Sequence, residues 1–148
     1  MDGDRLVIEL KGLNLGLGTK AVAGIVETEK IPFMPGQSGF IAGIISFRNE
    51  PVTVIDIPKA FGAAAGAEGG PHKVVVVKEK NRHLGLDAGS SAVSFLWEEE
   101  IKGLSPAQGG GKYIKEFIDV NGRSIGMIDS AALFEEAVRI LSTEGSGV

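Results

Sequence analysis

Two aspartates in this chain could act as a pair of acid–base catalysts. Asp56 ends the run "VTVID" and Asp129 ends the run "IGMID", so both carboxylates follow an apolar, strand-like segment. Two carboxylates that share a cleft can hold one proton between them and serve as general acid and general base. Each aspartate also precedes a helix-like segment, where a carboxylate can accept the unpaired N–H groups of the first turn. We expect Asp56 and Asp129 to be structural caps.

The other reactive residue types do not form a convergent set. No carboxylate stands at metal-ligand spacing from His72 or His83, so we expect these to be surface histidines. Ser90 and Ser91 lack a nearby histidine or a strained-elbow sequence, which gives little support to nucleophilic catalysis. The chain has no cysteine, which excludes disulfides and thiolate metal sites. The sequence therefore predicts no catalytic residue, no cofactor and no metal.

Composition narrows the classes of protein further. The net charge of −4, with scattered lysines, argues against a nucleic-acid surface, which needs a concentrated basic face. No apolar run approaches the ~20 residues needed to cross a bilayer, so direct membrane insertion is not expected. Because the first residues are polar and acidic we expect no secretory signal, and the absence of cysteine leads us to expect a cytoplasmic protein. The 22 glycines suggest many turns and a β-rich chain.

The elements that must position these residues are mostly short strands. Apolar runs predict strands at residues 5–10, 13–17, 73–78, 83–86, 117–120 and 123–128. The dipeptide Asn121-Gly122 favours a tight hairpin, because both residues tolerate positive φ. Only the segment at about 130–141 has the apolar spacing of a long helix. The glycine-rich stretches 62–71 and 105–112 are expected to be a linker and a loop.

The chain resembles itself after a shift of 73 residues. Residues 40–61 align with residues 113–134 without a gap, so that Ile41, Ile45, Ile55, Asp56 and Phe61 meet identical residue types. A shift of 69 places Leu15-Gly16-Leu17 on Leu84-Gly85-Leu86. The pattern indicates one β-unit used twice. We expect a β-hairpin over residues 40–57 with a polar tip at residues 48–51.

The most specific stretch resembles a known family. "IPFMPG" is followed by "FIAGIISFRNEPVTVIDI", a valine strand, "LGL" and "DVNGRSIGMIDSAAL". This order is similar to the CheW-like chemotaxis coupling proteins. Gly43, Ile45, Arg48 and Asp56 match the family pattern, whereas Glu116 stands where a glycine is usual. The resemblance covers about residues 5–141 and is strongest over 31–57.

The resemblance implies a fold and a function. The fold would be mainly β, with two small SH3-like five-stranded β-barrels packed side by side and one C-terminal α-helix. We expect residues 1–66 to form the first barrel, and residues 67–148 the second barrel with the helix. The implied function is that of a non-catalytic adaptor in bacterial chemotaxis. Its partners would be the regulatory domain of a CheA-type histidine kinase and the cytoplasmic tip of chemoreceptors.

The resemblance also suggests partner-binding residues on the first barrel. The matched strand and hairpin give the set Val22, Ile25, Val26, Glu27, Ile44, Ser46, Arg48, Asn49 and Glu50. The apolar members would count as a binding patch only where they are exposed, since valine and isoleucine are more often core residues. Trp97 could also anchor a partner. Packing of its ring under a turn is the preferred interpretation.

Two other functions stay open at this point. One is a small-ligand-binding or hydrolytic module on a duplicated barrel, with Asp56 and Asp129 as its chemistry. The other is a divergent CheW-like regulator that binds only one partner in a pathway other than taxis. The first requires the two carboxylates to share a pocket.

Overall fold

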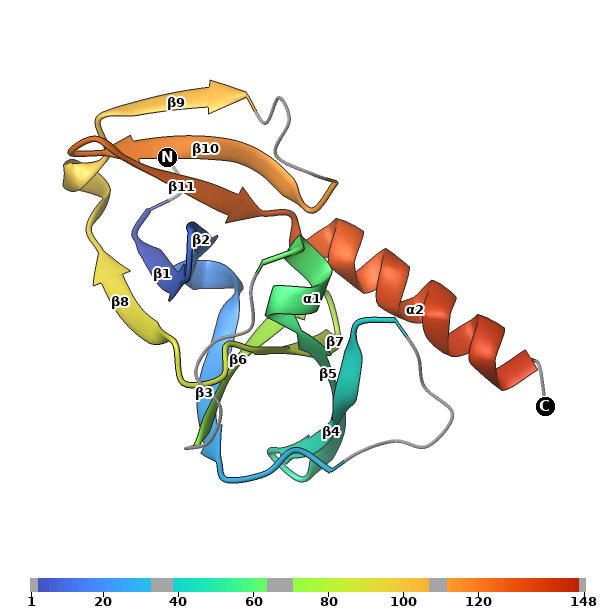
Figure 1. The fold of residues 1–148 in the computed structure, drawn as a ribbon. Helices are drawn as coiled ribbons and strands as arrows, with labels where there is room; N and C mark the ends of the chain where they lie inside the picture. The colour runs from blue at the N-terminus through green and yellow to red at the C-terminus, as the bar shows by residue number, and fades with distance from the viewer. Residues whose placement is uncertain (1–2, 33–38, 64–70, 107–111, 147–148) are drawn as a thin grey trace.

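The chain folds into two β-sheets that pack side by side, with a helix at the C-terminus (Figure 1). The structure is a computed structural model and describes residues 3–32, 39–63, 71–106 and 112–146. The expected linker at 62–71 and loop at 105–112 lie largely outside the described residues, as does the expected boundary between residues 66 and 67.

Eleven strands and two α-helices make up the described elements. The strands of the first half are β1 (Arg5–Leu10), β2 (Leu13–Gly18), β3 (Val22–Thr28), β4 (Ile41–Phe47) and β5 (Glu50–Asp56). Those of the second half are β6 (His72–Glu79), β7 (Arg82–Asp87), β8 (Ala92–Leu96), β9 (Gly103–Pro106), β10 (Ile114–Val120) and β11 (Arg123–Ile128). The α-helices are α1 (Ile57–Phe61) and α2 (Ser130–Ser146), and the 3-10 turns are η1 (Thr19–Ala21) and η2 (Glu98–Glu100).

The sheets confirm the predicted fold class in most respects. One sheet has six strands in the order β8-β1-β2-β11-β10-β9, and the other has five in the order β3-β6-β7-β5-β4. Each sheet is antiparallel except for one parallel contact, which joins β11 to β2 in the first and β5 to β7 in the second. One sheet therefore has the five strands expected of each barrel, and the other has one strand more.

The strands do not divide between the sheets as the ranges 1–66 and 67–148 would require. The hairpin β1–β2 lies in a sheet with β8 to β11, whereas β6–β7 lies in a sheet with β3, β4 and β5. Each half of the chain thus gives one hairpin to the sheet built mainly by the other half. Comparison of the sequence with itself finds equivalent segments, but it cannot tell which copy of a segment will pair with which.

The internal repeat is visible in the backbone. The amide of Asp56 donates to the carbonyl of Phe40, and the amide of Asp129 donates to that of Tyr113, both at 2.7 Å. The hairpins β4–β5 and β10–β11 also carry register shifts at equivalent places, after Ile41 and after Ile114. The 73-residue shift therefore relates real structural units.

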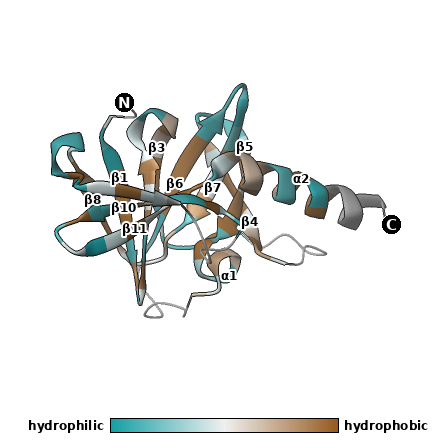
Figure 2. Cartoon of the chain, turned by 90° about the horizontal axis from the view of Figure 1, so that it is seen from above, coloured by the Kyte–Doolittle hydropathy of each residue, from teal (hydrophilic) through white to brown (hydrophobic). Residues whose placement is uncertain are grey.

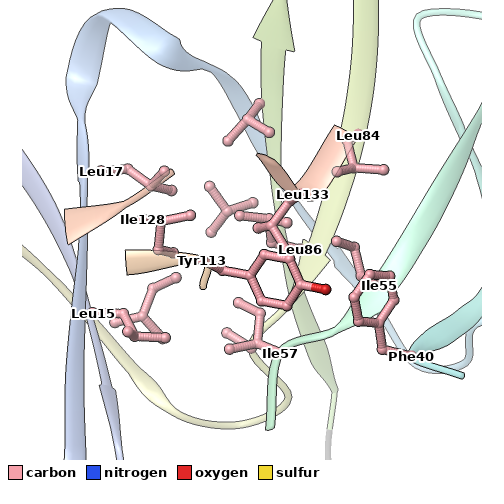
Figure 3. Packing of buried hydrophobic residues seen from close by; sticks show 14 of the residues in the cluster. Leu15, Leu17, Phe40, Ile55, Ile57, Leu84, Leu86, Tyr113, Ile128 and Leu133 are labelled. Carbon is pink, nitrogen blue, oxygen red and sulfur yellow. The ribbon is translucent and has the colours of Figure 1, made fainter. Parts of the chain in front are cut away.

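The largest hydrophobic cluster lies between the two sheets. Figure 3 shows Leu15 and Leu17 from β2 on one side and Leu84 and Leu86 from β7 on the other, with Tyr113 between them. The Tyr113 ring makes edge contacts with two phenylalanines, at centroid distances of 5.8 Å to Phe40 and 6.0 Å to Phe61. Because residues from both sheets build this cluster, which we call the central cluster, it joins them into one body.

Each sheet also has a smaller cluster on its other face. In the six-stranded sheet it contains Val7, Leu96, Ile118, Val120, Ile125 and Met127. In the five-stranded sheet it contains Ile45, Val52, Val54, Val74 and Val76. The valine run of β6 is buried on both faces, as its lack of alternation predicts.

Helix α2 covers one end of the central cluster. Leu133, Phe134, Ala137 and Ile140 are buried, and brown and teal segments alternate along the helix in Figure 2. Val138 belongs to the apolar spacing that predicts the helix, but its side chain is exposed. On the outer side, a hydrogen bond from Arg139 lowers the pKa of Glu136 and raises the pKa of Arg139.

Candidate partner-binding site

A groove opens between the end of β3 and the β4–β5 hairpin, with a volume of about 640 Å³. We call it the β3–β4 groove. Its lining consists of Val26, Glu27, Thr28, Lys30, Pro32, Ile44, Ile45, Ser46, Asn49, Glu50 and Pro51. Apolar side chains and both signs of charge therefore meet along one wall of the five-stranded sheet.

Most of the residues that the sequence predicts for partner binding meet in this groove. They are Val26, Glu27, Ile44, Ser46, Asn49 and Glu50. Ile44 and Ser46 are two residues apart on β4, so their side chains share a face of the strand. The groove lies at the β4 edge of the five-stranded sheet. There the amide of Ile44 donates to the carbonyl of Pro32 at 3.1 Å.

The remaining three predicted residues lie outside the groove lining. Ile25 is 47% exposed on β3, whereas Val22 is partly buried against the central cluster. Val26, which does line the groove, also packs against the cluster inside the five-stranded sheet. Of the apolar residues predicted on β3, Ile25 is therefore the one presented to solvent.

Arg48 has a different position from the one expected of a free charge at a hairpin tip. Its guanidinium donates to the carbonyl of Ala23 at 3.2 Å and lies 4.8 Å from the centre of the Phe47 ring. Such stacking of arginine on an aromatic face is attractive. Arg48 therefore fastens the hairpin tip to β3.

The tip itself is shorter than predicted. Arg48 and Asn49 have positive φ angles of 52° and 64°, and Glu50 already pairs with Phe47 as the first residue of β5. Two consecutive residues with positive φ are typical of the tight turn that matches the twist of a hairpin. The tip is thus a two-residue turn rather than the four residues 48–51.

Asp56 and Asp129 have the geometry of helix caps. Asp56 Oδ1 accepts from the amide of Lys59, and Asp129 Oδ1 accepts from the amide of Ala132, both at 3.1 Å. The two caps begin different helices, α1 and α2. Neither aspartate lines the β3–β4 groove or the two smaller cavities described next.

Of the two smaller cavities, the first adjoins the groove at Glu50 and Pro51, and the second shares no lining residue with it. One, of about 280 Å³, lies among the β4–β5 hairpin, the β6–β7 turn and α2, and Phe134 and Val138 are part of its wall. The other, of about 450 Å³, adjoins Arg5, Glu98 and Leu104 at the six-stranded sheet. Across the described ranges no group of three or more His, Cys, Asp or Glu side chains could hold a metal ion.

The pair of His72 and Asp87 is a polar contact that was not predicted from the sequence. His72 Nδ1 lies 3.1 Å from both carboxylate oxygens of Asp87, which is buried and also accepts from the amide of Gly89 at 2.8 Å. The register of β6 and β7 places Val74 opposite Asp87, so His72 and Asp87 are diagonal neighbours. The predicted strands 73–78 and 83–86 stop one residue short of His72 and Asp87. Strands longer by that one residue would have placed the two side chains side by side.

Comparison with known proteins identifies the family. The CheW-like domain family matches residues 4–138. The chain belongs to the CheW-like domain family. Among solved structures it is similar to the scaffolding protein TtCheW from Thermoanaerobacter tengcongensis, with a TM-score of 0.70 and 22% sequence identity. That match covers 86% of this chain and 89% of TtCheW, and at this identity it establishes the shared fold. A search of curated protein sequences gave no match.

Within the described ranges, no helix is both long enough and apolar enough to cross a bilayer.

Proposed function

We propose that this CheW-like protein is a non-catalytic, cytoplasmic adaptor that couples chemoreceptors to a CheA-type histidine kinase. The observation that carries the proposal is the family match over residues 4–138, combined with a groove that holds most of the partner-binding residues implied by the family. The similar structure is itself described as a scaffolding protein. A scaffold needs surfaces that bind partners, and it needs no convergent catalytic set.

The groove has the composition of a protein-binding surface. It combines exposed polar groups, such as Glu27 and Ser46, with apolar walls from Ile44 and Val26. Protein interfaces typically have an apolar centre and a polar rim. The Arg48 clamp to β3 holds the hairpin in place before a partner arrives, which lowers the ordering cost of binding. We propose the kinase regulatory domain as the partner of this groove.

A second surface concerns the receptor. Val22 and Ile25 lie on β3, and Val22 contacts the central cluster at the junction of the two sheets. An apolar edge at such a junction suits the apolar face of a helix. We propose that the helical tip of a chemoreceptor binds along this part of β3.

The proposal is tested by charge reversal in the groove. Glu27 is exposed and lines the groove, so Glu27→Lys should leave the fold intact. We expect it to weaken binding to a cognate kinase regulatory domain at least tenfold, about 1.4 kcal/mol. Isothermal titration with the purified regulatory domain measures the effect. Arg48→Ala should weaken the same binding by releasing the hairpin tip.

Two controls make the result interpretable. Glu135→Lys makes the same charge change at an exposed position on α2 and should leave affinity unchanged. Val26→Asp is unsuitable as a binding probe, because Val26 packs against a buried cluster and its loss would disturb the fold. Equal affinity of Glu27→Lys and wild type would remove the groove from the kinase interface. Binding to a receptor-tip fragment alone would favour a regulator with a single partner.

A further inference from the structure

An exposed pair of aromatic rings marks the end of β8. Phe95 is 49% exposed and Trp97 is 55% exposed, and their rings meet edge to face with centroids 4.8 Å apart and planes at 82°. The expectation that Trp97 packs under a turn is therefore wrong. Two large rings that shield each other rather than enter the core form an apolar surface patch of the kind that marks interaction sites.

β8 carries Phe95, ends one residue before Trp97, and has one edge that no strand of the described ranges covers. β8 pairs with β1 and stands first in the strand order, so among the described residues no strand pairs with its other side. Its side chains at Ala92 and Ser94 are exposed as well. In both views β8 lies on the opposite side of the molecule from β4 (Figures 1 and 2). An open strand edge can bind an extended chain through its backbone hydrogen bonds.

The backbone at Trp97, next to the aromatic pair, is held in place by the residues that follow it. The amide of Trp97 donates to Glu100 Oε2 at 3.3 Å, and the amide of Glu98 donates to Asp4 Oδ1 at 2.9 Å. These contacts fix η2 against the N-terminal segment that leads into β1. A partner would therefore meet a backbone at Trp97 that is already fixed, which lowers the ordering cost of binding.

Charge determines which partner fits. Three consecutive glutamates follow Trp97 in the chain: Glu99 and Glu100 are exposed, whereas one carboxylate oxygen of Glu98 is buried beside the cavity near Arg5. Asp4 adds a fourth carboxylate, which accepts from the amide of Glu98. A second copy of this chain would bring the same acidic groups together and repel. A basic segment would instead place its cations near the carboxylates and over the faces of the rings, where arginine and lysine are attracted.

We propose that β8 binds an extended basic segment of another protein by strand addition. The backbone of that segment pairs with the free edge of β8, and an arginine or lysine side chain stacks on the Phe95–Trp97 pair beside Glu98 to Glu100. This surface belongs to the six-stranded sheet and is separate from the β3–β4 groove. It stands whether or not the kinase or receptor binds as proposed above.

Trp97 provides the test, because it is the only tryptophan of the chain. The full chain is titrated with a synthetic heptapeptide of alternating threonine and arginine, and Trp97 fluorescence is recorded. The matched control peptide has glutamate in place of arginine. We expect a saturable change with the arginine peptide, and at least tenfold weaker binding of the glutamate peptide.

Two variants separate this surface from general attraction to an acidic protein. Phe95→Ser removes the stacking partner while Trp97 still reports, and Glu98→Gln/Glu99→Gln/Glu100→Gln removes the charge. Each should weaken the arginine peptide at least tenfold. Leu104→Ser changes another exposed apolar residue of the same sheet, on β9, and should have no effect. Thermal melts verify that each variant is folded.

Three results would overturn the proposal. The first is an arginine peptide that leaves Trp97 fluorescence unchanged. The second is binding that Phe95→Ser leaves at full strength, since the peptide would then be held elsewhere on an acidic surface. The third is concentration-dependent association of the free chain in sedimentation that Phe95→Ser abolishes, because it would assign β8 to a second copy of the chain.

Discussion

The hairpins β4–β5 and β10–β11 share a backbone frame but differ in what flanks them. Both have a register shift near the start, and both end in an aspartate that caps a helix. Beside β10, however, β9 forms a regular ladder in which Glu116 pairs with Pro106. Beside β4, the corresponding position shows a hydrogen bond from the amide of Ile44 to the carbonyl of Pro32.

The difference between the segments beside β4 and β10 is reflected in one pair of equivalent residues, Gly43 and Glu116. A Cβ added to Gly43 would lie 2.1 Å from the carbonyl oxygen of Pro32, far inside contact distance. The equivalent residue in the second hairpin is Glu116, which has a full side chain. The approach of the 29–32 segment to β4 forms part of the β3–β4 groove. The repeated hairpin therefore accommodates different neighbouring segments, and the segment beside β4 forms part of the candidate site.

The largest effects are expected where the two hairpins are most alike. Ile55 and Ile128 are equivalent, and both are buried in the central cluster. Replacement of either by alanine should reduce the free energy of unfolding by about 2–5 kcal/mol, through lost burial and the cavity left behind. Urea unfolding measures the loss. If one of the two replacements left the free energy of unfolding almost unchanged, the two hairpins would not contribute equally to the central cluster.

An intermediate effect should distinguish the flanks. Gly43→Ala places a methyl group against backbone atoms that have little room to move, and overpacking of this kind costs about 1–3 kcal/mol. Glu116→Ala should change stability by about 0.5 kcal/mol or less, as is usual for a partly exposed position. The two variants are compared by thermal melting. Similar losses for both would show that the two flanks are equivalent after all.

The smallest effects concern the caps. Asp56→Ala and Asp129→Ala each remove one hydrogen bond to a helical amide, so each should destabilise by about 1 kcal/mol. Asn replacements keep an accepting oxygen and should restore most of the loss. Urea unfolding of the four variants provides the measurement. A loss well above that of a cap, at either aspartate, would assign that carboxylate a further role in the fold.

The elements specified by local pattern were the predictable ones. Asn121, Gly122 and Asn49 are residue types that tolerate positive φ, whereas Arg48 is not, and alternating or continuous apolar runs locate most of the strands. The caps follow from aspartate before a helical stretch. Six of the groove residues were predicted from the family resemblance. The resemblance identifies motif positions on both strands directly, so the contact between the strands did not have to be predicted.

What could not be predicted depends on contacts between distant segments. The exchange of hairpins between the sheets is decided by packing in the central cluster, which no local run of residues encodes. The Arg48 clamp depends on how far the five-stranded sheet curls. The exposure of Trp97 depends on where β8 ends relative to its neighbour β1. In each case the residue type was compatible with either outcome.

The exchange of hairpins has a consequence for synthesis of the chain. Asn14 is made well before its parallel partner Ile125, so the six-stranded sheet cannot close until β11 has been synthesised. The five-stranded sheet gains its last strand, β7, much sooner. During that interval β1 and β2 expose apolar side chains whose final neighbours do not yet exist. Premature pairing of this hairpin is the hazard that a nascent chain of this topology must survive.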